Sequence, residues 1–572
     1  MQSERAAAPA APQSPSSPRC DRVELACKIV DLEQARRDRH ASIRSVAAQN
    51  DTARSTLQDQ LRATHNDGLP AAWQPFFESD VGVAFTLRLM ITVLVIFVLR
   101  GGCSAELAAE FFEAMHLRRF VASSPTALRR LFAQILTHTA TWGSAQRERL
   151  AKAMAPRDLV LALDENFHWD AILLGVVDVV TGFVFAERMS DTRDAEVWET
   201  SVRESLVGYN VCVRAITRDG ATALGSCAER LGVPAGHDIF HIQYAVCGAT
   251  ARPMAQRVVR ARAATQDRRD ELAALRAERD RAQALPRGPG RPTGWAAHEA
   301  RAVLAVEMTD QHAATMQAER DAMTASIRAL GDVHHPVDLT TGAAVSAEQA
   351  RERLQEAAEK LCEHAARASL GTRAIKALNG VFTRLNDLAA IVAWWHQEVR
   401  RQLDALSLPA VQVAWIESAL VPALYVQHRI ALGRNADERA SLRALWARLR
   451  GELLCEASPW RTWDAETQRV VQRVVQSCVA MFPRSTSALE GHNGQDALVH
   501  HQRHQLSETF RTARLVVRNY VIERADGTTA AERLFGHKPG DLIEYLCGNL
   551  KLPGRGRLGN KRPKPPLLAL TG

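Results

Sequence analysis

The chain has 572 residues, of which 46% are hydrophobic, and it carries a formal net charge of +8 with a pI of about 9.1. This length exceeds what one hydrophobic core usually serves, and the apolar content excludes a chain that is disordered throughout, so we expect several globular domains. The mild basic excess fits a polyanionic partner and equally fits ordinary solubilising charge.

The cysteines and the N-terminus indicate a cytoplasmic protein. The ten cysteines form neither a CxxC pair nor another zinc-binding spacing, which favours free thiols in a reducing compartment. Residues 1–20 are rich in Ala, Pro and Ser, lack the apolar segment of a signal peptide, and are predicted to be disordered. The apolar run Leu89–Leu99 is about half as long as a bilayer crossing requires, so we interpret it as part of a buried helix.

A first helical domain is predicted at residues 21–75. Small or apolar residues at helical spacing flank a polar turn: Ile43, Val46 and Ala47 before it, and Ala53, Leu57 and Leu61 after it. This pattern is typical of a helix-turn-helix, in which Arg54 would begin the recognition helix and contact DNA. A plain amphipathic helical hairpin explains the same pattern.

A second helical domain is predicted at residues 76–155. It has a Gly101–Gly102 break, a helix over Ala105–His116 and a cap at Ser123–Pro125. Its basic residues Arg118, Arg119, Arg129 and Arg130 are candidate phosphate contacts, and Arg129 and Arg130 are the residues that we predict to bind DNA. The alternative is a packing domain whose basic face is simply solvated.

The segment from Asp158 to Asp219 is the one convincing β-rich part of the chain. β-Branched runs broken by Gly and Asp predict four strands. The predicted elements are a strand at Leu159–Asp164, a hairpin at Ala171–Met189 that turns near Thr181–Gly182, a helix around Ala195–Val207 and a strand at Val211–Asp219.

Asp164 and Asp219 are expected to close the first and last of these strands. If the two strands are neighbours in one sheet, both carboxylates lie on the same rim. Phosphodiester chemistry with two divalent ions about 3.5–4 Å apart needs such shared oxygen ligands. An aspartate is also a frequent strand terminator, so neither residue is informative alone.

The chain is predicted to be helical again from about residue 251 to residue 480. Arg257–Leu285 has the pattern of a long helix or short coiled coil, and Pro286–Pro292 breaks it. Within that break, Arg287–Pro292 faintly resembles an AT-hook and is also explained as a helix-breaking turn. Tryptophans 394, 395, 415, 446, 460 and 463 are candidates for core packing or for stacking on flipped bases. Residues 549–572 form a predicted flexible basic tail, in which Arg555, Arg557, Lys561 and Arg562 are candidate DNA contacts.

The order of these elements resembles the DDE transposases with an RNase H-like fold. Asp164-Glu-Asn-Phe167 followed by VVDVVTGF resembles the first element of that family, and ITRDGA around Asp219 resembles the second. Asp238-Ile-Phe-His241 is similar to the C/DxxH signature of several transposase groups. STSALEGHNGQDALVHHQRHQ resembles the last element, which supplies a glutamate, here Glu490.

The resemblance implies a fold that is mainly α with an α/β RNase H-like core. The core would occupy residues 156–250 and 481–548, with an all-helical insertion at 251–480 and helical, helix-turn-helix-like domains before it. Asp164, Asp219 and Glu490 would be both the catalytic residues and the ligands of two Mg²⁺ or Mn²⁺ ions. Supporting roles would go to Arg218, Asp238, His241 and Asn493, and DNA contacts to His500, His501 and Arg503. Asp238 and His241 are equally explained as braces of the sheet.

The implied activity is metal-dependent cleavage at transposon ends, followed by transfer of the 3′-hydroxyl end into target DNA. The implied partner is double-stranded DNA, bound by a homodimer or higher oligomer associated with a bacterial nucleoid. Two rival functions are an inactive, repurposed transposase that only binds DNA and an RNase H-like nuclease without strand transfer. A purely structural helical protein does not explain the β-rich segment.

Overall fold

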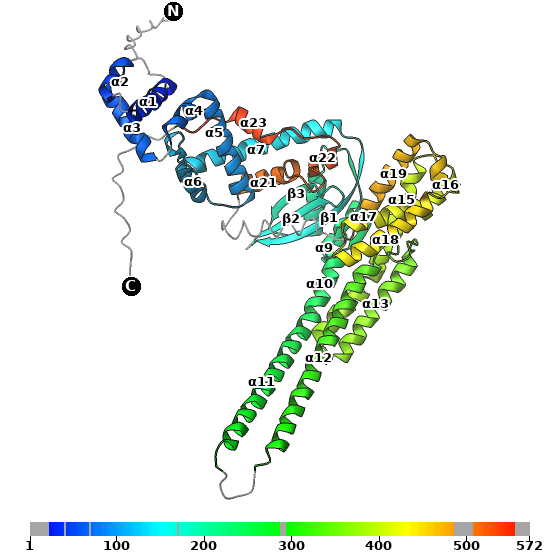
Figure 1. Ribbon diagram of the computed structural model, residues 1–572. Coiled ribbons are helices and arrows are strands. Elements are labelled where there is room, and N and C mark those ends of the chain that lie inside the picture. Colours follow the sequence, from blue (N-terminus) through cyan, green and yellow to red (C-terminus); the bar gives the residue numbers. More distant parts are fainter. Residues whose placement is uncertain are drawn as a thin grey trace, which may run out of the picture. The chain divides into compact units, whose positions relative to one another are not determined.

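The computed structural model describes residues 22–38, 42–67, 70–168, 171–286, 293–484 and 507–554. The chain divides into two compact units (Figure 1). The first comprises Met1–Leu150, Val499–Glu532 and His537–Gly572, and the second comprises Ala151–Leu498 and Arg533–Gly536. The described residues are mainly helical, with one small mixed sheet, which confirms the predicted mainly α class with an α/β part.

The first unit begins with three helices around a small hydrophobic core. These are α1 (Arg22–Arg37), α2 (Ile43–Gln49) and α3 (Arg54–Asp67). Val46, Ala47, Leu57 and Leu61 are buried between them, as the predicted spacing requires, whereas Ala53 is exposed because it precedes the first turn of α3. α2, α3 and the turn between them thus lie where the sequence predicts two helices and a polar turn.

Lys28 fastens α1 to the turn between α2 and α3. Its ammonium donates to the carbonyl of Asn50 (3.0 Å) and the hydroxyl of Thr52 (3.1 Å) and pairs with Glu24 (2.7 Å). The side chain is largely buried, so its charge is compensated by these oxygens rather than by water. The turn is therefore held in place by Lys28, a charged residue that the helical periodicity of α1 predicts to lie on the surface.

The rest of the first unit is also helical. Its elements are η1 (Ala71–Trp73), α4 (Gln74–Glu78), α5 (Asp80–Val93), the π-helix η2 (Leu94–Arg100), α6 (Ala105–Ala114), η3 (Leu117–Arg119), α7 (Pro125–Ala153), α21 (Glu508–Tyr520) and α23 (Leu542–Asn549). Gly102 adopts a positive φ of 72°, which ends η2 at the predicted glycine break. The described residues 507–532 and 537–548 thus pack with the first unit and not, as predicted, with the sheet.

Two contacts explain this correction. The Arg514 guanidinium of α21 donates to the carbonyl of Leu99 (2.9 Å) at the end of η2, where a helix leaves carbonyls without intrahelical partners. Val516 packs so closely on α7 that a Cβ at Gly143 would lie 2.3 Å from its Cγ2. Both contacts join segments more than 350 residues apart, so no local sequence pattern predicts them.

Helices α5 and η2 run on continuously from Asp80 to Arg100, over 21 residues. The helix is therefore about twice as long as the apolar run predicts, and by length and composition alone it meets the requirement for a membrane span. One face is packed in the first unit, with Met90, Ile91, Leu94 and Leu99 fully buried. The prediction of a buried helix thus holds for that face, and a core helix passes the same length test.

The second unit contains a five-stranded sheet in the order β3-β2-β1-β4-β5. β1 (Arg157–His168), β2 (Ala171–Asp178) and β3 (Val184–Ser190) are antiparallel neighbours, whereas β4 (Val211–Arg218) and β5 (Ala235–His237) run parallel to β1. The predicted hairpin and the strand before Asp219 are confirmed. The short strand β5 escaped prediction because its three residues, Ala-Gly-His, carry no β-branched signal.

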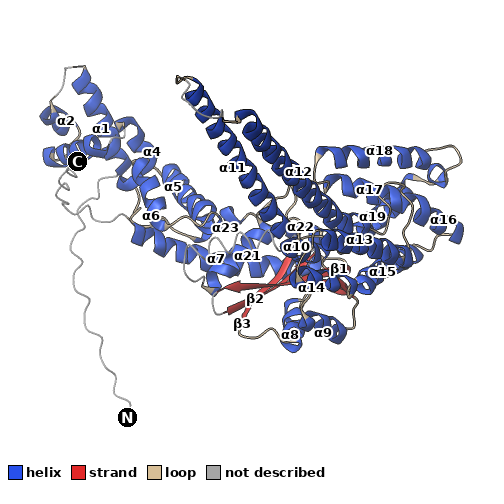
Figure 2. Ribbon diagram, turned by 90° about the horizontal axis from the view of Figure 1, so that it is seen from below, coloured by secondary structure: helices blue, strands red, loops and turns tan. Residues whose placement is uncertain are grey.

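Helices cover both faces of this sheet (Figure 2). α8 (Ala195–Ser205) and α9 (Thr222–Leu231) pack against β2, β3 and β4. On the other face, Val160 and Ala215 belong to the core of the helical segment that follows, together with Ile391 and Trp395. Because side chains alternate along a strand, Asp164 shares the face of Val160, and Phe167 lies on the opposite face.

All described residues from Ile239 to Arg484 are helices and loops, apart from an isolated bridge between Val337 and Ala344. The elements are α10 (Ile239–Ala249), α11 (Ala251–Gln283), α12 (Trp295–Val333), α13 (Ala347–Arg367), α14 (Thr372–Phe382), α15 (Leu385–Asp404), α16 (Ala410–Trp415), the π-helix η4 (Ile416–Leu420), α17 (Val421–Ala431), α18 (Ala436–Leu453), η5 (Pro459–Thr462) and α19 (Ala465–Ala480). α11 and α12 form the long antiparallel hairpin of Figure 1, with Val258 and Ile327 buried at its base.

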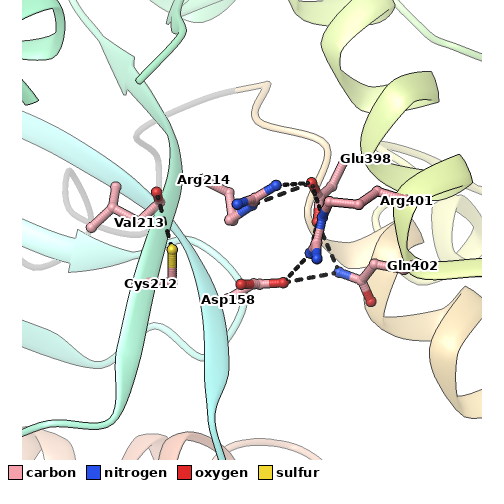
Figure 3. Close-up of polar contacts among 7 residues, drawn as sticks. All are labelled: Asp158, Cys212, Val213, Arg214, Glu398, Arg401 and Gln402. Carbon is pink, nitrogen blue, oxygen red and sulfur yellow. Dashed lines mark hydrogen bonds and ion pairs between the residues drawn. The ribbon is translucent and has the colours of Figure 1, made fainter. Parts of the chain in front are cut away.

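A buried carboxylate fastens this helical segment to the sheet (Figure 3). Glu398 of α15 accepts hydrogen bonds from Arg214 of β4 (2.9 Å), from Arg401 (2.5 Å) and from Gln402 (3.0 Å). Arg401 also pairs with Asp158 of β1. Burial alone would raise the pKa of Glu398, but these hydrogen bonds outweigh burial and hold the pKa below its usual value.

The Glu398→Ala substitution is expected to destabilise the protein by about 3 kcal/mol or more, because it leaves Arg214 and Arg401 without their shared anion. Since the folded pKa of Glu398 is depressed, its contribution is present above the ordinary glutamate pKa and is lost as the pH falls through the folded value. Thermal unfolding at neutral and acidic pH measures both effects. Glu417→Ala, which removes the exposed partner of Arg400, is the control and should cost less than about 1 kcal/mol. Equal losses for the two variants would contradict the anchoring role.

Candidate functional site

Asp164 and Asp219 lie side by side where β1 and β4 separate. The last parallel pair between these strands is Leu163 with Arg218, so the two aspartates occupy the next position on each strand. The prediction that Asp164 closes its strand is wrong. β1 continues to His168, because its antiparallel pairing with β2 extends past the end of β4. Asp219 does follow the end of β4, and its Oδ1 accepts a hydrogen bond from the Ala221 amide (2.8 Å).

Asp238 adds a third carboxylate to this rim. Its amide donates to the carbonyl of Arg218 (2.8 Å), which holds it beside the end of β4. Its Oδ1 accepts from the Phe240 amide (2.6 Å), so it is the N-cap of α10. His241 lies one turn later, with Nε2 3.9 Å from Asp238 Oδ2. The DxxH motif is thus a helix start that places a carboxylate and an imidazole next to the two predicted aspartates.

The carboxylates influence one another electrostatically. Burial raises the pKa of Asp164 to about 6; the charge of His241 opposes this, and the charges of Asp219 and Asp238 reinforce it. Asp164 is 7% exposed and Asp238 is 1% exposed, so water screens their repulsion only weakly. The negative charges of these carboxylates are therefore incompletely compensated by the surrounding protein groups.

A divalent cation fits this donor set. Carboxylate oxygens are the ligands that Mg²⁺ and Mn²⁺ prefer, and a cation would favour the ionised form of the buried Asp164. Within the part of the chain that the structure describes, no group of three His, Cys, Asp or Glu side chains is arranged to hold a metal ion. The predicted third ligand, Glu490, lies outside the described residues.

The described chain nevertheless leads from the insertion back to this rim. Arg484, the last described residue before 485–506, accepts a hydrogen bond at its carbonyl from the amide of Ile239 (3.3 Å). Ile239 directly follows Asp238. Four further predicted residues also lie outside the described part, namely Asn493, His500, His501 and Arg503. So do the Arg287–Pro292 motif and the tail residues Arg555, Arg557, Lys561 and Arg562.

Arg218 serves the loop after β4. Its guanidinium donates to the carbonyl oxygens of Asp219 (3.2 Å) and Ala221 (3.5 Å), and burial lowers its pKa. Arg384, just before α15, comes so close to this loop that a Cβ at Gly220 would lie 2.8 Å from its Nη2. Arg384 escaped prediction because it lies more than 160 residues away along the chain.

Asn166 is a second residue that sequence reasoning missed. It is two positions after Asp164 on β1 and therefore on the same face of the sheet. Its amide nitrogen is buried and has no hydrogen-bond partner among the described residues. A buried donor without a partner costs free energy, so this nitrogen is available to an oxygen atom that approaches the rim.

The candidate DNA contacts of the first unit differ from one another. Arg54 is exposed at the start of α3, whereas Arg129 forms an ion pair with Glu106. Arg130 lines a pocket of about 510 Å³ whose lining includes His138 and Lys551 and contains no acidic residue. Lys551 lies in the described beginning of the predicted basic tail. The pocket is thus suited to an anion, whereas Arg129 is already engaged.

The insertion tryptophans are packing residues. Trp395 is fully buried and donates its Nε1 to the carbonyl of Cys478 (2.8 Å). Trp415 and Trp463 meet edge to face, with centroids 5.7 Å apart, and all six tryptophans belong to or border one core cluster. Of the two interpretations of these residues, core packing agrees with the structure.

The segment that ends at Phe535 packs against the sheet. Phe535 lies in α22 (Ala530–Phe535), where its ring stacks on Tyr209 (5.9 Å) and meets Phe183 edge to face (5.6 Å). Arg157 of β1 donates to the carbonyl of Leu534 (2.8 Å). The segment thus covers the end of the sheet opposite to the acidic rim.

The Asp164→Asn substitution is expected to stabilise the metal-free protein at neutral pH. A raised folded pKa means that stability is fully present below the ordinary aspartate pKa and is lost as the pH rises through about 6. Asn keeps an acceptor for the Glu165 amide but removes the charge. The gain at neutral pH should reach up to about 3 kcal/mol and vanish near the ordinary aspartate pKa. Equilibrium unfolding in EDTA measures it, and Asp191→Asn, at an exposed position, is the control. A variant less stable than the parent at neutral pH would contradict the raised pKa of Asp164.

Comparison with known families finds one match: residues 416–562 match a family described as a family of unknown function (DUF6399). The matched segment includes the end of the helical insertion, the predicted Glu490 and part of the basic tail. A search of curated proteins found no match.

Proposed function

We propose that the chain is a DNA transposase of the DDE type, with an RNase H-like core that cleaves and joins phosphodiester bonds. The observation that carries the proposal is the pairing of β1 with β4, which brings Asp164 and Asp219 to one rim and Asp238 beside them. Burial, reinforced by the charges of Asp219 and Asp238, raises the pKa of Asp164, which makes its ionised form costly unless a cation lies beside it; groups perturbed in this way gather at functional sites.

The topology supports the same proposal. In the family that the sequence resembles, the first aspartate lies on the first strand, a hairpin follows, and the second aspartate follows the fourth strand. β1, the β2–β3 hairpin and β4 have this order, and a long helical segment then separates Asp219 from Glu490. Glu490 follows Arg484 by six residues, a length of chain that spans at most about 20 Å.

Each residue has a proposed task. Asp164, Asp219 and Glu490 would hold two Mg²⁺ or Mn²⁺ ions, which when bound activate the attacking oxygen and stabilise the leaving oxygen. Asp238 and His241 position the start of α10 and set the charge around Asp164. Asn166 is placed to donate a hydrogen bond to a phosphate oxygen, and Arg218 shapes the loop that carries Asp219.

The basic surfaces supply affinity for the substrate in this proposal. Arg54, Arg130 and the basic tail would bind the phosphates of double-stranded DNA, with an affinity that falls as salt rises. A dimer or higher oligomer would hold two transposon ends together, in a bacterial cytoplasm close to the nucleoid.

Divalent cations should stabilise the folded protein through the acidic rim. A ligand that binds only the folded state at about 100 times its Kd adds about 2.7 kcal/mol, so Mg²⁺ or Mn²⁺ should raise the Tm of the parent. Asp164→Asn and Asp219→Asn should each remove most of the shift, and Asp191→Asn should keep it. An undiminished shift in both rim variants would place the cation elsewhere.

The decisive experiment is a cleavage and joining assay on DNA that contains the ends of the mobile element that carries this gene. With Mn²⁺ or Mg²⁺ the parent should nick the element's ends and join the freed 3′-hydroxyl to target DNA. Asp164→Asn, Asp219→Asn and Glu490→Gln should each lower the rate by about 100-fold or more. Cleavage without joining would favour the nuclease, DNA binding without cleavage would favour the inactive binder, and full activity of Glu490→Gln would refute the three-acid site.

A further inference from the structure

An exposed strip of aromatic and arginine side chains leads away from the acidic rim along α10 and the first half of α11. We call it the aromatic–arginine strip; its aromatic members are Phe240 and Tyr244, and its four arginines, Arg252, Arg257, Arg260 and Arg262, are distributed around the exposed circumference of α11.

The two aromatic rings of the strip are open to solvent. Phe240 is 43% exposed and Tyr244 is 54% exposed, although both lie in a helix that buries Ile242 and Val246 on its other side. Being four residues apart, the rings lie on one helix face, nearly parallel at 26° with their centroids 6.1 Å apart. The Arg252 guanidinium lies 5.3 Å from the centroid of Tyr244 and donates to its hydroxyl (3.3 Å). The two rings and the guanidinium therefore form one preorganised aromatic and cationic group on the surface of the helix.

The four arginines of the strip have no carboxylate partner among the described residues. Residues 251–266 contain these four arginines and neither Asp nor Glu. Arg257 and Arg262 donate to uncharged oxygens, of Ala368 and Gln317. The second half of α11 is different, because Arg269 pairs with Asp310 and Arg276 pairs with Glu299 across the hairpin. The half of α11 that adjoins α10 therefore carries positive charge that no carboxylate of the described residues neutralises.

The strip begins at the acidic rim itself. The Phe240 amide donates to Asp238, and the Phe240 ring centroid lies 6.0 Å from that of His241, whose charge acts on Asp164. A polymer whose backbone is cut at the rim would thus pass directly onto stacked rings and then onto arginines.

We propose that the aromatic–arginine strip binds an unpaired DNA strand next to the scissile phosphate, with bases stacked on Phe240 and Tyr244 and phosphates on Arg252 and Arg260. Stacked aromatic platforms combined with a cationic track are what single-stranded nucleic acid requires, because every base has a π face and the backbone is a polyanion. Paired bases in a duplex do not offer their faces to a side chain. This inference rests on the proposed function, since it assigns the nucleic acid strand that the same rim cleaves.

The test compares three fluorescently labelled probes with the full-length protein in EDTA, where no cleavage occurs: a short single strand, the corresponding duplex, and that duplex with an unpaired end. Anisotropy titrations give the affinities. The Phe240→Leu/Tyr244→Leu double variant keeps apolar side chains but removes the rings. It should bind the single strand and the unpaired end about tenfold or more weakly and leave the blunt duplex nearly unchanged.

The arginines have a separate signature. Arg252→Gln and Arg260→Gln should each reduce the slope of log affinity against log salt for the single strand by about 0.7. Arg281→Gln, on the distal part of α11, is the matched control for charge. Phe167→Leu removes an aromatic side chain that is 60% exposed on the opposite face of the sheet, and it is the matched control for the rings. Both controls should retain the parent affinities.

The inference is refuted if the double variant, shown to be folded by its melting curve, binds the single strand as tightly as the parent does. It is also refuted if the variant's affinity for the duplex falls as much as its affinity for the single strand. A change of sedimentation from dimer to monomer would instead make this face an interface between copies. The proposed function is tested separately, by the cleavage assay. If strand binding depends on the aromatic–arginine strip but the parent shows no metal-dependent cleavage, the proposed function is overturned and the inference about strand binding stands.

Discussion

The parallel pairing of β1 with β4 is the interaction on which the candidate site depends. It ends at Leu163 and Arg218, and the next residue of each strand is an aspartate. Because the backbone hydrogen bonds of a sheet fix this register, a slip of one residue would send one carboxylate to the other face. The amide of Asp238 then binds the carbonyl of Arg218, which extends the register to a third carboxylate.

Concentrating carboxylates at a buried rim costs stability, and contacts elsewhere join the sheet to the helical segment beside it. Glu398 binds Arg214 and Arg401 near the opposite end of β4, so the long helical segment is fastened to the very strand that carries Asp219. Arg384 approaches the loop at Gly220 from the same segment. The helical segment from Ile239 to Arg484 is therefore part of the framework of the rim.

Two uses of arginine distinguish the halves of the α11–α12 hairpin. Toward its tip, arginines pair with Asp310 and Glu299 of the facing helix and hold the two helices together where few apolar side chains are buried. At its base, Met254 and Val258 are buried and packing holds the helices instead, which leaves the arginines of the aromatic–arginine strip free of carboxylates. Apolar packing at the base thus makes a cationic surface possible beside the acidic rim.

The sequence by itself determined the helices, the β2–β3 hairpin and the strand before Asp219, because hydrophobic periodicity and turn residues act over a few positions. It also singled out Asp164, Asp219 and the helix start at Asp238 as chemically notable. Only the tertiary structure decided that β1 runs past Asp164, that Lys28 and Glu398 are buried, and that α21 packs on η2 through Arg514. These features depend on partners tens to hundreds of residues away, and burial of a charge can be read only when the oxygens or guanidinium groups that compensate it are in place.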